Sequence, residues 1–302
     1  MTRLRFSLYN TLSRLVAFSF VILFLPHHKG KINLSILEIA GLAATGFLAG
    51  IFGTIVGIGG GIVFVPVFLL IFHFTPQQAT GTSLFAIFFN VLSGSISYLR
   101  QKRVDIKAGW KFALATIPGA FLGAWLANFL TSNILQIIFG LLLIIVAALS
   151  FIRAEPKSIM PKEGEMRRIE DIHGHTFLYR PREGLGVFLS LLIGIISSLI
   201  GIGGGIIHVP AMIYLLGFPV HIATATSQFV LVISTFFGSI GHITLGDTLI
   251  IPGLIVGIAA IPGAILGAEL SRRLKGLLII RLLAIALITL GIRLLLKAFD
   301  IL

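Results

Sequence analysis

The chain has 302 residues, of which 57% are apolar and only 11% are charged, and its formal net charge is +12. Soluble domains carry about 25% charged residues, so this composition, with a mean hydropathy of +1.06, excludes an ordinary soluble protein and indicates a polytopic helical membrane protein. The absence of cysteine excludes disulfides, cysteine-ligated zinc and thiol catalysis.

Residues 1–33 are predicted to form an N-terminal anchor or a short first span. Arg3, Arg5 and Arg14 precede an apolar run at 15–25, which is the layout of a signal sequence. Because no small-residue cleavage site follows this run, we expect the segment to stay attached, with its N-terminus in the cytoplasm.

A glycine-rich segment occurs twice in the rest of the chain. Gly57–Pro66 reads GIGGGIVFVP and Gly201–Pro210 reads GIGGGIIHVP, an offset of 144 positions from 57 to 201. Two further pairs match at this offset: ATGTS at 79–83 with ATATS at 223–227, and IPGAFLGA at 117–124 with IPGAILGA at 261–268. A register kept without gaps over this distance indicates duplication of one folding unit.

The duplication divides the chain into two transmembrane repeats, residues 34–152 and 184–302, joined by a polar linker at 153–183 that we expect in the cytoplasm. Each repeat is predicted to form five helical elements, the first two separated only by the glycine-rich segment. In the second repeat these elements are expected at 185–200, 206–216, 221–243, 249–270 and 277–296.

The positions of Lys and Arg predict how the repeats are oriented. One basic loop follows the third element of the first repeat and contains Arg100, Lys102, Arg103 and Lys107. The other follows the fourth element of the second repeat and contains Arg272, Arg273 and Lys275. Because basic loops stay in the cytoplasm, the repeats are predicted to be inverted, and the clustered charge does not indicate nucleic-acid binding. The predicted fold is an all-α polytopic membrane protein with two inverted-topology repeats and helices broken at the paired glycine-rich segments, an arrangement typical of secondary transporters.

The repeated glycines predict that a helix is broken in each repeat. A glycine inside a helix costs about 1 kcal/mol relative to alanine, so four glycines within five positions disfavour a continuous helix. In hydrocarbon, an irregular backbone is tolerated only where protein buries it or where it lines a cavity. The helix that follows directs its free N–H groups and its positive dipole end toward that site, where anions bind without basic side chains.

An anion is therefore predicted to bind at the two breaks. The backbone candidates are Gly57, Gly59, Gly60 and Gly61, with Gly201, Gly203, Gly204 and Gly205. The side-chain candidates are Thr80, Thr82 and Ser83, with Thr224, Thr226, Ser227 and Gln228. The alternatives are close helix packing for the glycines and bonds to carbonyls of the same helix for the hydroxyls. Four other glycines are predicted to serve packing only: Gly119, Gly123, Gly263 and Gly267.

Few ionisable residues fall inside the predicted spans. His208, five positions after Gly203, is a candidate for proton coupling because histidine titrates near neutral pH, with simple packing as the alternative. Glu269 is expected to form an ion pair with Arg272 and Arg273 at the membrane boundary.

The paired segments resemble those of a known family. The glycine-rich segments followed by Val-Pro at 57–66 and 201–210, with the ATxTS elements at 79–83 and 223–227, are similar to those of the sulfite exporter TauE/SafE family, also called the 4-toluene sulfonate uptake permease family. The resemblance covers the chain from about residue 38 to residue 298. It implies a membrane permease for sulfur-containing anions such as sulfite, sulfonates or sulfoacetate, without specifying the anion.

We therefore expect a secondary transporter of small sulfur-containing anions that works by alternating access, with the anion bound at the helix breaks near the midplane. An anion channel with the same repeats is the alternative. An enzyme is not expected, because Gly-x-Ser-x-Gly and His-Glu-x-x-His motifs are absent from the sequence.

The expected partners are the lipid bilayer of a prokaryotic cell membrane and a small anionic substrate, with a coupling proton and a homodimer left open. No cofactor or metal is expected. His173 and His175 lie with Glu170 and Asp171 in the polar linker, where we expect them to be solvated rather than to bind a metal.

Overall fold

The computed structural model describes residues 35–126, six positions between 137 and 148, and residues 165–298. All but the first two of these residues belong to one compact unit, Leu37–Leu302. The predicted N-terminal anchor at 1–33 lies outside the described residues, and so does the last predicted element of the first repeat apart from those six positions.

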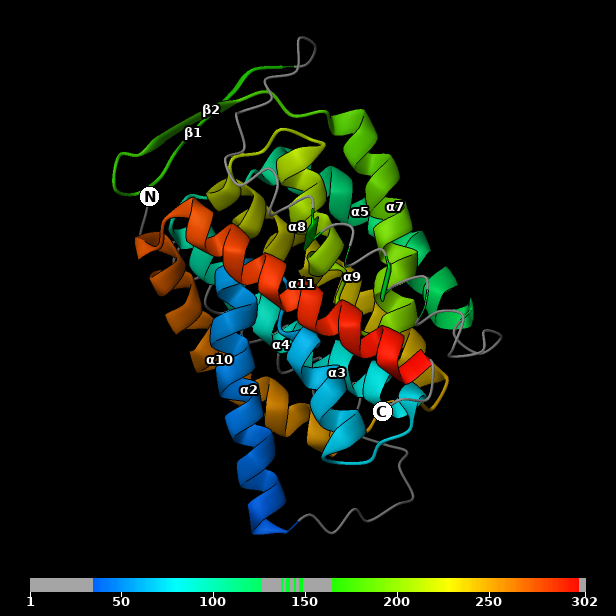
Figure 1. Ribbon diagram of the computed structural model, residues 1–302. Coiled ribbons are helices and arrows are strands. Elements are labelled where there is room, and N and C mark those ends of the chain that lie inside the picture. The colour runs from blue at the N-terminus through cyan, green and yellow to red at the C-terminus, as the bar shows by residue number, and fades with distance from the viewer. Residues whose placement is uncertain are drawn as a thin grey trace, which may run out of the picture. The chain divides into compact units, whose positions relative to one another are not determined.

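Helices make up both repeats (Figure 1). In the first repeat they are α2 (Ile36–Val56), α3 (Gly61–Leu70), α4 (Pro76–Arg100) and α5 (Ile106–Leu126). In the second they are α7 (Glu183–Ile200), α8 (Gly205–Tyr214), α9 (Val220–Thr244), α10 (Ile250–Arg273) and α11 (Gly276–Ala298). These five match the elements predicted for the second repeat to within a few residues. Among the described helices, α2, α4, α7, α9, α10 and α11 are long and apolar enough to cross a membrane, so this is a multi-pass membrane protein.

The polar linker contains a β-hairpin that the sequence analysis did not predict. Strand β1 (Arg167–Glu170) pairs antiparallel with β2 (Thr176–Tyr179). The turn of this hairpin lies beside both basic loops: the Ile172 N–H donates to the Gln101 carbonyl oxygen at 3.3 Å, and Arg272 Nη1 lies 2.9 Å from His173 Nε2. The hairpin therefore brings together the two loops that the positive-inside rule assigns to the same face.

The start of α4 shows how local sequence defines a helix end. Thr75 is the N-cap, its Oγ1 accepts from the Gln78 N–H at 3.3 Å, and Gln78 Oε1 accepts from the Thr75 N–H at 3.1 Å. This reciprocal capping box satisfies two N–H groups that the first turn would otherwise leave without partners.

Glycines allow α5 to pack closely on α7 and α2 to pack closely on α10, side by side in Figure 1. A Cβ at Gly194 would lie 2.5 Å from the Thr116 carbonyl oxygen, and one at Gly50 would lie 2.6 Å from that of Ala260. The four glycines predicted to serve packing also face carbonyl oxygens of the neighbouring helix: Gly119, Gly123, Gly263 and Gly267. Their packing role is confirmed.

These contacts between the two repeats occur twice, with the roles of the repeats exchanged. Gly50 and Ala260 correspond, at the offset of 144, to Gly194 and Thr116, so the α2–α10 contact repeats as α7–α5. Such reciprocity is typical of a two-fold relation.

The equivalent helices α4 and α9 pack against each other in opposite directions. The Gly81 Cβ position lies 3.0 Å from His242 Cβ, near the end of α9, whereas that of Gly94 lies 3.2 Å from Gln228 Oε1, near its start. Equivalent helices of an inverted repeat are expected to run antiparallel, and this pair does.

We expect Gly194→Ala to destabilise the protein by about 1–3 kcal/mol, because the added methyl group overlaps the Thr116 carbonyl and pushes α7 from α5. The measurement is the midpoint of thermal unfolding of the detergent-solubilised protein. Gly184→Ala on the same helix is the matched control, since a Cβ there has nothing within 4 Å. Equal midpoints for the two variants would contradict the packing role.

Candidate functional site

Both predicted helix breaks are present, and glycine is what permits them. Between α2 and α3, and again between α7 and α8, three glycines have positive φ: Gly57, Gly59 and Gly60, and Gly201, Gly203 and Gly204, with φ from 70° to 87°. All six are buried. Because a side chain in this left-handed region costs about 1–2 kcal/mol per residue, the backbone path through each break depends on glycine.

Neither helix that follows a break is capped by a side chain. The N-caps of α3 and α8 are Gly60 and Gly204, and neither provides a side-chain hydrogen bond to the first turn. The positive dipole end of each helix is therefore directed at buried surroundings. At α8, the Gly205 and Ile207 N–H groups already donate to the Gly203 and Gly204 carbonyl oxygens.

Each break lies against the other repeat. The Cβ position of Gly61 is 2.7 Å from the Ile202 carbonyl carbon, and that of Gly205 is 2.6 Å from Ile58 Cα. The two breaks thus contact each other, and apolar residues that flank both of them belong to one core cluster, among them Val56 and Ile206.

The threonines at the start of each ATxTS element meet the opposite break. The Cβ position of Gly57 is 2.8 Å from Thr224 Cα, and that of Gly201 is 2.5 Å from Thr80 Cα. Thr80 Oγ1 donates to the Ile200 carbonyl oxygen at 3.4 Å. Thr224 Oγ1 instead donates to the His221 carbonyl oxygen at 3.2 Å, which is the local bonding named as the alternative.

The other candidate side chains are divided between the breaks and the helix starts. Ser227 Oγ donates to the Gly57 carbonyl oxygen at 3.0 Å, and Gln228 Nε2 donates to that of Gly53 at 3.1 Å, so both lie at the first break. In contrast, Thr82 Oγ1 accepts from the Leu249 N–H at 2.9 Å, and Thr226 Oγ1 accepts from the Asp105 N–H at 3.0 Å. These two threonines bind the backbone before α10 and α5.

Polar residues that the sequence analysis missed complete the first break. Asn90, on α4, donates from Nδ2 to the Gly59 carbonyl oxygen at 2.8 Å, and its Oδ1 accepts from Thr54 Oγ1 at 3.1 Å. Tyr98 donates to the Thr54 carbonyl oxygen at 2.8 Å. An asparagine inside an apolar helix was the available signal for this site.

The second break has unpartnered hydroxyls instead. Ser197 lies beside Gly204, with its Cβ 2.9 Å from the Cβ position of that glycine. Within the described part of the chain, the buried hydroxyls of Ser83, Ser197 and Ser198 have no hydrogen-bond partner. A cavity of about 20 Å³ touches Ser197 and Gly204, and a buried hydroxyl without a partner costs about 1–3 kcal/mol.

That cavity is large enough for about one water molecule. An oxoanion of four or five heavy atoms needs more space than this cavity offers.

His208 lies one turn into α8. Its N–H donates to the Gly204 carbonyl oxygen at 3.0 Å, its Nε2 lies 3.3 Å from Ser190 Oγ on α7, and its ring packs edge-on against Phe112. Its Nδ1 has no partner among the described residues. Glu269 does pair with Arg272 and Arg273, as predicted.

Comparison with known proteins agrees with this architecture. The family described as "Sulfite exporter TauE/SafE" matches residues 42–294. The chain is 34% identical over 265 residues to the probable membrane transporter protein YunE of Bacillus subtilis (strain 168), covering 84% of this chain and 96% of YunE.

Two other relatives are also named as probable membrane transporters. The chain is 32% identical to the probable membrane transporter protein ORF9 of Sinorhizobium sp, covering 85% of this chain and 92% of that protein. It is 27% identical to MJ0441 of Methanocaldococcus jannaschii, covering 78% and 86% respectively. No solved structure matches the chain. Since the family match extends over most of its length, the chain belongs to the TauE/SafE sulfite exporter family of membrane transporters.

Proposed function

We propose that the protein is a secondary transporter in the cell membrane for small sulfur-containing anions such as sulfite, sulfonates or sulfoacetate. The family supports this class of substrate. The anion binds at the helix breaks, and the two repeats move relative to each other to expose it to alternate sides.

The second break carries this proposal. There an uncapped helix start, at Gly205, lies with the unpartnered hydroxyl of Ser197 in buried surroundings. N–H groups and hydroxyls donate hydrogen bonds, and the oxygens of a deprotonated oxoanion only accept them. An anion would therefore give the Ser197 hydroxyl the acceptor that it lacks and would face the positive end of α8.

The antiparallel packing of α4 and α9 supports inverted repeats in the membrane. Both helices are long enough to span it. If the two repeats exchanged their conformations, the protein would adopt a second state with the same chain connectivity. Alternating access of this kind needs no ATP-binding motif, because ion or substrate gradients drive it.

The first prediction concerns Gly203→Val. In proteoliposomes, the native protein is expected to catalyse counterflow of sulfite, thiosulfate, sulfoacetate or isethionate, and the variant is expected to lose it because φ at Gly203 is +85°. Gly246→Val is the matched control, since Gly246 also has a positive φ, of 79°, but has nothing within 4 Å of its Cβ position.

Ser197→Ala tests the same site without a steric change. Losing one hydrogen bond to a charged ligand should weaken the apparent affinity for substrate about tenfold. Full counterflow in Gly203→Val, or native affinity in Ser197→Ala, would count against the break as the site. Fluxes too fast for a conformational cycle would favour the channel instead.

The second prediction concerns orientation. Lys102 and Gly246 are separated by the repeat offset, and both lie in exposed turns. A membrane-impermeant maleimide should label Gly246→Cys in intact cells and label Lys102→Cys only after permeabilisation. The native chain has no cysteine and serves as the blank. Labelling of both variants from the same side would rule out inverted repeats.

The third prediction concerns proton coupling. If His208 carries the coupling proton, His208→Gln should flatten the pH dependence of transport, because glutamine keeps hydrogen-bonding groups but does not titrate. Transport rates are compared across pH gradients, with the exposed His73→Gln as the control. An unchanged pH profile in His208→Gln would remove this residue from the mechanism.

A further inference from the structure

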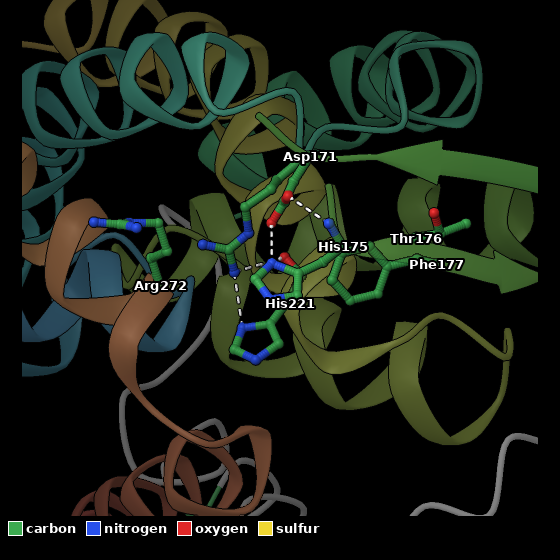
Figure 2. A pocket seen from close by; sticks show the side chains of 7 residues that line it. Asp171, His175, Thr176, Phe177, His221 and Arg272 are labelled. Atoms are coloured by element: carbon green, nitrogen blue, oxygen red, sulfur yellow. Dashed lines mark hydrogen bonds and ion pairs between the residues drawn. The ribbon is translucent and has the colours of Figure 1, made fainter. Parts of the chain in front are cut away.

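A pocket of about 350 Å³ lies beside the basic loops (Figure 2). Its walls come from four parts of the chain: the loop after α4, the β-hairpin, the start of α9 and the end of α10. The lining residues are Arg103, Asp171, His175, Thr176, Phe177, His221 and Arg272.

Arg103 is the central cation of this pocket. Its side chain is only 2% exposed. Its Nη1 donates to Gln101 Oε1 at 3.1 Å, and its Nη2 lies 2.8 Å from His221 Nδ1. No carboxylate of the described residues lies within 4 Å of it, and burial lowers the pKa of Arg103.

A second buried arginine among the described residues, Arg167, has the carboxylate partners that Arg103 lacks. Arg167, on β1, forms ion pairs with both Asp105 and Glu183. A buried charge is costly unless an opposite charge compensates it. Arg103 thus has neutral partners where Arg167 has two carboxylates.

A second arginine and two imidazoles extend the donor set. Arg272 lines the pocket from the end of α10; its Nη atoms contact Glu269 and His173, and its Nε has no hydrogen-bond partner among the described residues. Figure 2 shows His175 and His221 between the hairpin and α9. Arginine pairs strongly with tetrahedral oxoanions because its planar N–H groups match two oxygens.

Asp171 is the one carboxylate in the lining, and it restricts which anion fits. Its Oδ1 accepts from the N–H groups of His173 at 2.8 Å and His175 at 2.9 Å, and its Oδ2 lies 3.0 Å from His175 Nδ1. Burial opposes ionisation of Asp171, but these hydrogen bonds outweigh it and hold the pKa of the carboxyl below its usual range.

A carboxylate has about four acceptor positions, so these three bonds leave one on Oδ2. A ligand must therefore offer a donor to Asp171 and acceptors to the arginines. An oxoanion that retains one proton, such as hydrogen phosphate, meets both requirements. Sulfate has no proton at neutral pH, and its oxygens would face the carboxylate without a hydrogen bond. A metal ion is disfavoured, since within the described ranges no three His, Asp or Glu side chains are grouped to hold one.

We propose that this pocket is a regulatory site for a protonated oxoanion of the hydrogen phosphate class. The bound anion contacts Arg103 of the first repeat, Arg272 of the second and Asp171 of the hairpin. By joining these three parts it holds the two repeats in the arrangement seen here and slows transport.

Isothermal titration of the full-length protein in detergent at neutral pH tests this proposal. Sodium phosphate should bind with one site per chain, and sodium sulfate at the same ionic strength should bind about tenfold more weakly or not at all, because Asp171 lacks a donor from it. This comparison uses the native chain, so no folding defect can confuse it.

Two matched variants test whether phosphate binds in this pocket. Arg272→Gln should weaken phosphate binding about tenfold, whereas Arg273→Gln, which removes the same charge from an adjacent exposed residue outside the pocket, should not. Gly203→Val should also keep phosphate binding, which separates this site from the helix breaks. Equal affinity for phosphate and sulfate, equal loss in the two arginine variants, or no phosphate binding by the native chain would each overturn the proposal.

Discussion

The structure depends on glycine backbone that takes a left-handed path in the middle of an apolar protein. Three glycines with positive φ in each repeat end one helix and begin another within a few residues. A side chain at any of them would strain the backbone, and at Gly57 and Gly201 it would also collide with the opposite repeat. The same absence of Cβ atoms lets the two breaks touch, which is why the centre of the molecule is both irregular and closely packed.

Reciprocal contacts between the repeats follow from that centre. Gly57 meets Thr224 and Gly201 meets Thr80, and these pairs exchange places at the repeat offset. The antiparallel helices α4 and α9 pack on each other, and each of them contacts the break of the other repeat, so the two breaks are coupled through the same packing. Because close-packed interfaces change between discrete arrangements rather than deforming smoothly, this packing suits a transporter with two states.

The repeats have nevertheless diverged in polarity. Asn90 and Thr54 fill the first break with bonded side chains, whereas their counterparts Ser234 and Ser198 are shorter or leave a hydroxyl unpartnered. A symmetric backbone thus carries asymmetric polar groups: bonded side chains fill most of the first break, where Gln228 Oε1 is left without a partner, and unpartnered hydroxyls lie at the second. On the basic face, Arg103 and Asp171 form a second polar centre that the repeat does not duplicate, since the counterparts of Arg103 and Lys102 are Asp247 and Gly246.

The sequence by itself determined the membrane class, the duplication, the helix breaks and the second-repeat elements. The reason is that the length of an apolar segment and a run of glycines determine local structure and can be read directly from the sequence. It also identified Thr80 and Thr224 beside the breaks, through their repeated motif. Only the tertiary structure decided that Thr82 and Thr226 bind other helix starts, that Asn90 completes the first break, and that the linker forms a hairpin over both basic loops. Those outcomes depend on which distant backbone groups lie within hydrogen-bond reach, and no spacing along the chain encodes that distance.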